Sequence, residues 1–198
     1  DVAVTGVQTC ALPIYHDGEV GVALAAAAQE AGLVLSCQAS TRLEDIADAI
    51  GGETDRGPLW MQLYIQPDRG FTKELVLRAV AAGYEAIVLT VDAPTSGARD
   101  RERRAQFKLP SGISAVNLSG MQHPPVPDLL PGQSALFDDL LQYAPSWDDI
   151  AWLQAQTRLP ILLKGVLHED DARQARDLGV QGLIVSNHGG RTLDTALS

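Results

Sequence analysis

Short apolar runs alternate with amphipathic segments along most of the chain. The run AIVLTV at residues 86–91 is apolar and rich in β-branched residues, which is typical of a strand buried on both faces. Residues 41–50 instead place Leu43, Ile46 and Ile50 at helical spacing. Strands are predicted at residues 33–36, 59–65, 86–91, 161–166 and 182–186. Helices are predicted at residues 19–31, 41–50, 71–82, 146–157 and 168–178.

Local signals mark the ends of several predicted helices. Gly32, Gly83 and Gly179 each stand where an amphipathic pattern stops, and glycine readily takes the left-handed conformation that ends many helices. Ser146 precedes the fourth helix and Asp149 follows three residues later, which indicates an N-terminal cap at Ser146. Capping residues and the apolar pattern therefore predict the same segments.

The alternation of strands and helices predicts a parallel sheet, because each helix returns the chain to the same end of the sheet. An open doubly wound sheet and a (β/α)₈ barrel both fit. The G-x-G-x-x-G turn of many open nucleotide-binding sheets is absent. Polar residues instead lie at the C-terminal ends of successive strands, and barrel enzymes build their active sites from strand ends. These residues are Ser36, Gln62, Tyr64, Thr90, Asp92, Lys164, Asn187 and His188. The favoured fold class is therefore α/β, of the (β/α)₈ TIM-barrel type.

Composition narrows the classes of protein to consider. The 198 residues are 45% hydrophobic, enough for one domain with a substantial core, and the formal net charge is −10. This charge argues against a nucleic-acid partner, since such proteins concentrate lysine and arginine on one face. No stretch approaches the roughly 18 apolar residues of a membrane span. Cys10 and Cys37 lack a C-x-x-C or histidine-rich companion, so we expect no metal site, no disulfide framework and a reduced, cytoplasmic setting.

The first residues have an unusual character. Residues 4–14, VTGVQTCALPI, coincide with the frame-one translation of a common sequencing-library adapter. We therefore expect residues 1–14 to be a non-native scar that is not part of the native fold. Residues 15–198 are then the native part, with Cys37 as its one cysteine.

Taken singly, each strand-end residue has an ordinary interpretation. A lysine after an apolar strand is commonly a paired surface residue, and a histidine after a strand is commonly a loop residue. Five strand ends that all carry titratable or amide groups are better explained by one shared site.

Five collinear motifs carry a family resemblance. They are QLYIQPDR (62–69), LTVDAP (89–94), SWDDIAWL (146–153), LPILLKGV (159–166) and IVSNHGGRTLD (184–194). From about His16 to its end, the chain resembles the FMN-dependent α-hydroxy-acid oxidases and dehydrogenases. This family includes glycolate oxidase, lactate oxidase, flavin-type lactate dehydrogenase and mandelate dehydrogenase. The resemblance implies an enzyme that oxidises L-2-hydroxy acids to 2-keto acids, with hydride passing to FMN.

The resemblance also implies catalytic and substrate-binding roles. His188 matches the base that removes a proton from the hydroxy acid, and an imidazole has a suitable pKa for this task. Asp92 matches the carboxylate that pairs with this histidine. Arg191 matches the guanidinium that binds the substrate carboxylate with two hydrogen bonds. Tyr64 matches a phenol in the substrate site, and Arg99 an arginine at its mouth, although TSGARDRER around Arg99 departs from the family pattern.

Flavin contacts follow in the same way. Lys164 matches the lysine beside flavin N1 and O2, where a cation stabilises the reduced ring. Gln62, Thr90 and Ser36 match groups that bond the polar edge of the isoalloxazine. Ser186 is expected to contact the flavin or its ribityl chain.

Measured against the family, the chain corresponds to about strands two to six of the barrel. The N-terminal segment with strand one, and strands seven and eight with the phosphate-binding loops, are expected outside it. We therefore expect the chain to be a barrel fragment truncated at both ends and inactive alone, since such barrels need about 250 residues. The implied partners of the parent are a small 2-hydroxy acid, an electron acceptor (oxygen, a quinone or a cytochrome) and further copies of itself in a homo-tetramer.

Three other interpretations stay open at this point. The first is another FMN-binding barrel enzyme, such as a type 2 isopentenyl diphosphate isomerase or a relative of inosine monophosphate dehydrogenase. The second is a non-catalytic binding or scaffold protein derived from a barrel. The third is a non-functional fragment.

Overall fold

The computed structural model describes residues 16–93, 104–122, 130–132, 144–193 and 195. The expected scar at residues 1–14 and the candidate Arg99 lie outside these residues. None of the helices in the described part combines the length and the apolar character that crossing a bilayer requires.

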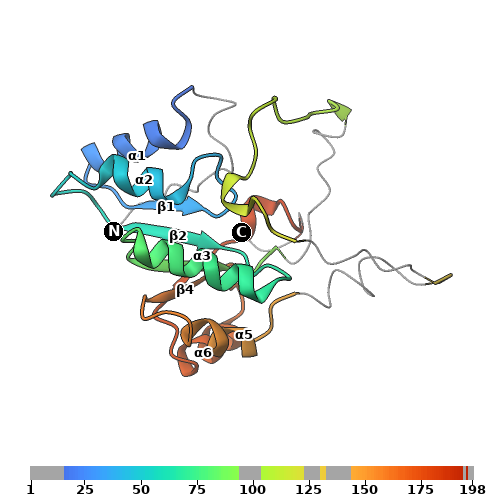
Figure 1. Ribbon diagram of the computed structural model, residues 1–198. Helices are drawn as coiled ribbons and strands as arrows, with labels where there is room; N and C mark the ends of the chain where they lie inside the picture. Colours follow the sequence, from blue (N-terminus) through green and yellow to red (C-terminus); the bar gives the residue numbers. More distant parts are fainter. Residues whose placement is uncertain (1–15, 94–103, 123–129, 133–143, 194, 196–198) are drawn as a thin grey trace.

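Five parallel strands form one sheet in the order of the sequence (Figure 1). They are β1 (Leu33–Ser36), β2 (Leu59–Leu63), β3 (Ala86–Thr90), β4 (Ile161–Lys164) and β5 (Gly182–Ile184). Sequential parallel pairing is the arrangement of a barrel segment and differs from the crossed order of a doubly wound sheet. All five strands were predicted, and the parallel sheet is confirmed.

Helices connect the strands. They are α1 (Gly18–Ala28), α2 (Leu43–Ile50), α3 (Arg69–Ala81), α5 (Asp148–Gln154) and α6 (Glu169–Asp177), with short 3-10 turns η1 (Val116–Leu118) and η4 (His188–Gly190). Figure 1 shows α1 and α2 near β1, α3 across the middle of the sheet, and α5 and α6 near β4. Both 3-10 turns lie beyond the arrowheads, on the side where the strands end.

The strand register separates two faces of the sheet. Met61 pairs with Ile87, which pairs with Ile161, and this row belongs to the hydrophobic core that the helices complete. Fully burying one such side chain stabilises the fold by about 1.5–3 kcal/mol. Because successive side chains point to opposite faces, Gln62 and Thr90 lie on the face turned away from this core. The sheet therefore presents its polar strand-end residues on one side.

Two of the three predicted helix stops are confirmed. Gly83 and Gly179 have positive φ angles of 83° and 78°, and the amides that follow them, of Tyr84 and Val180, bond back five residues to the helix. The prediction for Gly32 is wrong. Helix α1 ends at Ala28, and Glu30 takes the left-handed conformation with φ 54°. Gly32 serves close packing instead, since a Cβ there would lie 3.3 Å from Pro58 Cγ.

The predicted cap at Ser146 also differs from the structure. Helix α5 begins at Asp148, and the Ser146 side chain does not accept a hydrogen bond from the helix. Instead, the Ser146 backbone amide donates to Asp149 Oδ2 at 2.7 Å. The other carboxylate oxygen of Asp149 pairs with Arg69 Nη2 at 2.6 Å, and the Arg69 guanidinium lies 5.3 Å from the Trp152 ring centroid. Asp149 thus joins α5 to the start of α3.

Candidate active site

The carboxyl ends of three neighbouring strands carry a continuous line of hydrogen bonds. Ser36 Oγ donates to Gln62 Oε1 at 3.1 Å, and Gln62 Nε2 donates to Thr90 Oγ1 at 3.0 Å. Ser36 and Thr90 are buried, and Gln62 is half-buried. These bonds use one acceptor position and one donor of the Gln62 amide. The second N–H of that amide can therefore serve a ligand that offers an acceptor.

The cysteine next to this line of hydrogen bonds is a buried, unreactive thiol. Cys37 is buried, with its Sγ 4.0 Å from Gln62 Oε1. Burial raises the pKa of its thiol to about 11, which keeps the sulfur protonated at neutral pH. Among the described residues, no group of three or more His, Cys, Asp or Glu side chains could hold a metal ion.

An acid–base cluster lies next to this line, at the ends of β3, β4 and β5. Asp92 Oδ1 lies 2.7 Å from His188 Nδ1, and Lys164 Nζ lies 3.5 Å from Asp92 Oδ2 and 3.4 Å from His188 Nδ1. The Asp92 side chain is 8% exposed, whereas those of His188 and Lys164 are 24% and 25% exposed. The carboxylate is thus shielded while the ring and the ammonium reach solvent.

This geometry determines what the imidazole can do. The short contact with Asp92 holds a proton on Nδ1, so Nε2 is left as the basic nitrogen. When Nε2 takes a proton, the buried carboxylate stabilises the resulting imidazolium. The cluster can therefore act as a general base with an adjacent cation.

The loop that carries His188 is held in an uncommon conformation. His188 has φ 59°, a value that non-glycine residues adopt rarely, and Gly189 and Gly190 follow with φ 65° and 68°. Asn187 Oδ1 accepts hydrogen bonds from both glycine amides, at 3.0 and 3.3 Å, and Ser186 Oγ accepts one from the His188 amide at 3.0 Å. Backbone strain of this kind persists where the surroundings enforce it, commonly at functional sites.

Gly165 lies against Asp92 and was not among the candidate residues expected from the sequence. Its φ is +109°, and a Cβ at this position would lie 2.3 Å from Asp92 Cβ and 2.4 Å from Asp92 Cγ. Any side chain there would displace the carboxylate from His188. The available signal was its place in LLKGV, directly after the strand-end Lys164.

The structure brings six of the ten candidate residues into these two groups: Ser36, Gln62, Thr90, Asp92, Lys164 and His188. Ser186 joins them through the His188 amide. Tyr64 follows β2 and packs, partly buried, against the edge of the core. Arg191 is exposed and its amide bonds to the His188 carbonyl at 3.3 Å, which places its backbone beside the cluster.

Nearly the whole sequence matches a known protein family. The model of the family described as "FMN-dependent dehydrogenase" matches residues 2–198. An L-lactate oxidase from Roseobacter sp. (strain GAI101) is 50% identical over 183 residues, which cover 92% of this chain and 48% of that protein. Human 2-hydroxyacid oxidase 1 is 40% identical over 197 residues, 98% of this chain and 51% of that protein.

Solved structures resemble the fold as well. Mandelate oxidase with (S)-2-phenylpropionate has a TM-score of 0.79 and 36% identity, covering 98% of this chain and 49% of that one. A mandelate oxidase variant with a C4a-OH-FMN adduct has a TM-score of 0.79 and 35% identity, covering 98% and 50%. The chain thus spans about half the length of the relatives it matches, and the fold class expected from the sequence, part of a TIM barrel, is confirmed.

Proposed function

This chain belongs to the FMN-dependent dehydrogenase family, and we propose that it forms the central part of a longer enzyme that oxidises L-2-hydroxy acids to 2-keto acids. The observation that carries the proposal is the Asp92–His188 contact of 2.7 Å beside Lys164, at the carboxyl ends of adjacent barrel strands. Lactate, glycolate and mandelate are the candidate substrates, in keeping with the names of the similar proteins.

The strand-end residues fit FMN chemically. The ring edge of a flavin alternates acceptors with an N–H donor, and Gln62 together with Ser36 and Thr90 offers both kinds of group in a row. Lys164 supplies a cation at the end of that row. In our proposal these four residues hold the isoalloxazine, and Ser186 contacts the flavin or its ribityl chain. FMN supplies the acceptor for the hydride that leaves the substrate.

The proton is handled by this chain's own residues. His188 Nε2 takes the proton of the substrate hydroxyl, and Asp92 stabilises the imidazolium that results. Arg191 binds the substrate carboxylate, for which its planar guanidinium provides two parallel donors. Tyr64 lines the substrate site, and Arg99 contributes to substrate binding at the mouth of that site. We propose cytoplasmic homo-oligomers, and the names of the relatives as oxidases favour oxygen over a quinone or cytochrome as the acceptor.

The test uses the full-length protein that contains this chain, loaded with FMN and kept free of oxygen. Mixing with L-lactate, glycolate or mandelate is expected to bleach the flavin, and admitting oxygen is expected to restore the colour. Propionate, which lacks the 2-hydroxyl group, is the matched control and leaves the flavin oxidised. A protein that binds FMN but is bleached by no 2-hydroxy acid would contradict the proposal.

A further inference from the structure

A buried carboxylate on α1 has no part in the acid–base cluster. Glu19 is 4% exposed, and its oxygens accept hydrogen bonds from the Ser40 amide, the Ser40 hydroxyl and the Thr41 hydroxyl, each at 2.9 Å. Burial raises the pKa of Glu19, but the hydrogen bonds from Ser40 and Thr41 outweigh that effect, so the pKa is lowered. Glu19 is therefore an anion bound to the connection between β1 and α2.

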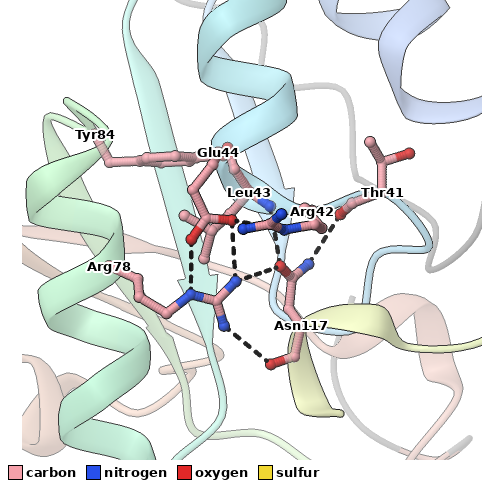
Figure 2. A network of polar contacts seen from close by, with 7 residues as sticks. All are labelled: Thr41, Arg42, Leu43, Glu44, Arg78, Tyr84 and Asn117. Carbon is pink, nitrogen blue, oxygen red and sulfur yellow. Dashed lines mark hydrogen bonds and ion pairs between the residues drawn. The ribbon is translucent and has the colours of Figure 1, made fainter.

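Asn117 holds the same connection from another element. Its Oδ1 accepts from the Leu43 amide at 2.9 Å, and its Nδ2 donates to the Thr41 carbonyl at 3.0 Å. Figure 2 shows Asn117 on the η1 turn, facing Thr41 and Leu43 at the start of α2. The Val116 amide also donates to the Ala39 carbonyl at 3.2 Å. Residues 39–43 are thus fixed by α1 and by η1 together.

This connection in turn orients Ser36. The Gln38 amide donates to Ser36 Oγ at 3.1 Å, which leaves the Ser36 hydroxyl hydrogen to point at Gln62 Oε1. Gln62 must then present Nε2 to Thr90. A displacement of the connection would withdraw the Gln38 amide, and the Ser36 hydroxyl could turn away.

We propose that Glu19 is a positioning residue that sets the orientation of the Gln62 amide, and with it the strength of flavin binding, by holding the β1–α2 connection. The proposal rests on the function proposed above, because it takes Gln62 as a flavin-binding group. Glu19 itself lies on a helix beside the sheet and is connected to the site through Ser40, Gln38 and Ser36.

The nature of the substitution decides the size of the effect. Glu19→Ala removes every acceptor and leaves the Ser40 amide and two hydroxyls without that partner. Glu19→Gln retains one oxygen for the Ser40 amide, and the Thr41 hydroxyl can reverse its role and accept from the new amide. Glutamine is therefore expected to recover most of what alanine loses.

The experiment measures FMN binding in the full-length protein, by quenching of flavin fluorescence and by the visible absorption spectrum of the bound flavin. Glu19→Ala is expected to weaken FMN binding about tenfold, the effect of losing roughly one good hydrogen bond at the flavin, and to shift the spectrum. Glu19→Gln is expected to stay within about threefold of the wild type. Asp48→Ala, which removes an exposed carboxylate from α2, is the matched control and is expected to change neither readout.

Ser40→Ala gives a second route if the Glu19→Ala protein does not fold. It removes one hydroxyl while the Ser40 amide still reaches Glu19, and an affinity loss of about threefold is expected. Folded variants with lower melting temperatures but unchanged FMN affinity and spectrum would overturn the inference. Failure of the wild type to bind FMN at all would instead overturn the proposed function.

Discussion

Two acid–cation clusters in this molecule combine similar residue types in different geometries. Between α2 and α3, Arg78 donates to both oxygens of Glu44, at 2.7 and 3.0 Å, and also to Asn117 (Figure 2). At the strand ends, Lys164 approaches Asp92 no closer than 3.5 Å, and the closest partner of Asp92 is a histidine. The first cluster is a two-pronged ion pair, whereas the second is a looser group of three.

The two clusters also differ in how firmly their polar groups are held. The Arg78 hydrogen bonds lower the pKa of Glu44, while Glu44 raises the pKa of Arg78, so both charges are locked in place. His188 instead adopts a left-handed backbone, and its Nε2 has no partner among the described residues. In the function proposed above, this nitrogen is the available base, and the strained backbone aims it.

Removing the reactive atom is expected to have the largest effect. In the full-length protein, His188→Ala should slow anaerobic flavin reduction by 2-hydroxy acids by about 10²–10⁴, the usual contribution of a general base, while FMN stays bound. Stopped-flow absorbance measures the rate. His168→Asn is the control, because His168 is exposed and asparagine can replace it as the cap of α6. An unchanged rate in His188→Ala would assign the base to another residue.

A side chain at Gly165, next to Asp92, is expected to have the second largest effect. Gly165→Ala must overcome both φ +109° and the contact with Asp92, so unfolding free energy is expected to fall by about 2–4 kcal/mol. The surviving folded protein should also reduce its flavin slowly, because Asp92 is displaced from His188. Gly83→Ala separates the two causes: it has φ +83° but open space around it, so about 1 kcal/mol is expected with no change in rate. Equal rates for the two variants would show that Gly165 does not position Asp92.

Weakening the structural pair should act on stability alone. Arg78→Lys keeps the charge but loses the two-pronged geometry, and urea titration is expected to give a loss of about 1–2 kcal/mol. Flavin reduction should stay at the wild-type rate. Arg173→Lys in the exposed pairs of α6 is the comparison and should change stability by less than about 0.5 kcal/mol. A large rate effect for Arg78→Lys would mean that the two clusters are coupled.

The smallest expected effect is the pH dependence of the same pair. Arg78 depresses the pKa of Glu44 in the folded protein below its usual value of 4.5. The resulting stability is therefore present above pH 4.5 and is lost as the pH falls through the lower, folded-state value. Glu44→Gln should be less stable than wild type at neutral pH by under about 1 kcal/mol, and the gap should close in acid. A gap that stays constant with pH would contradict the assigned role of the Glu44 charge.

The sequence predicted the strands well but extended four of them too far. Residues 64–65, 91, 165–166 and 185–186 were expected to be strand, yet β2, β3, β4 and β5 end at Leu63, Thr90, Lys164 and Ile184. At β4 the reason is local, since the positive φ of Gly165 cannot continue an extended ladder. An apolar pattern indicates which residues are buried, and burial continues for a few residues after the hydrogen-bonded ladder has ended. The pattern therefore predicts strands that are too long.

The residues around the candidate site were also predicted only in part. Asp92, Lys164 and His188 were found because each lies at or shortly after the carboxyl end of a strand, and parallel strands end together. Glu19 and Asn117 carry no such signal: Glu19 reads as an ordinary helical glutamate, and Asn117 meets Leu43 across 74 positions of sequence. Contacts of that kind depend on how the connections fold back, which no local pattern describes.

The consecutive order of the strands also bears on how the chain folds. Ser36 and Gln62, which join β1 to β2, are 26 positions apart, whereas Asp92 and Lys164, which join β3 to β4, are 72 positions apart. Closing the longer loop is less favourable by about 1 kcal/mol of chain entropy. The strands β1 to β3 can therefore pair first, as each leaves the ribosome, with Ser36, Gln62 and Thr90 already aligned. Asp92 can contact Lys164 and His188 only after the long connection between β3 and β4 has been made and has brought β4 against β3.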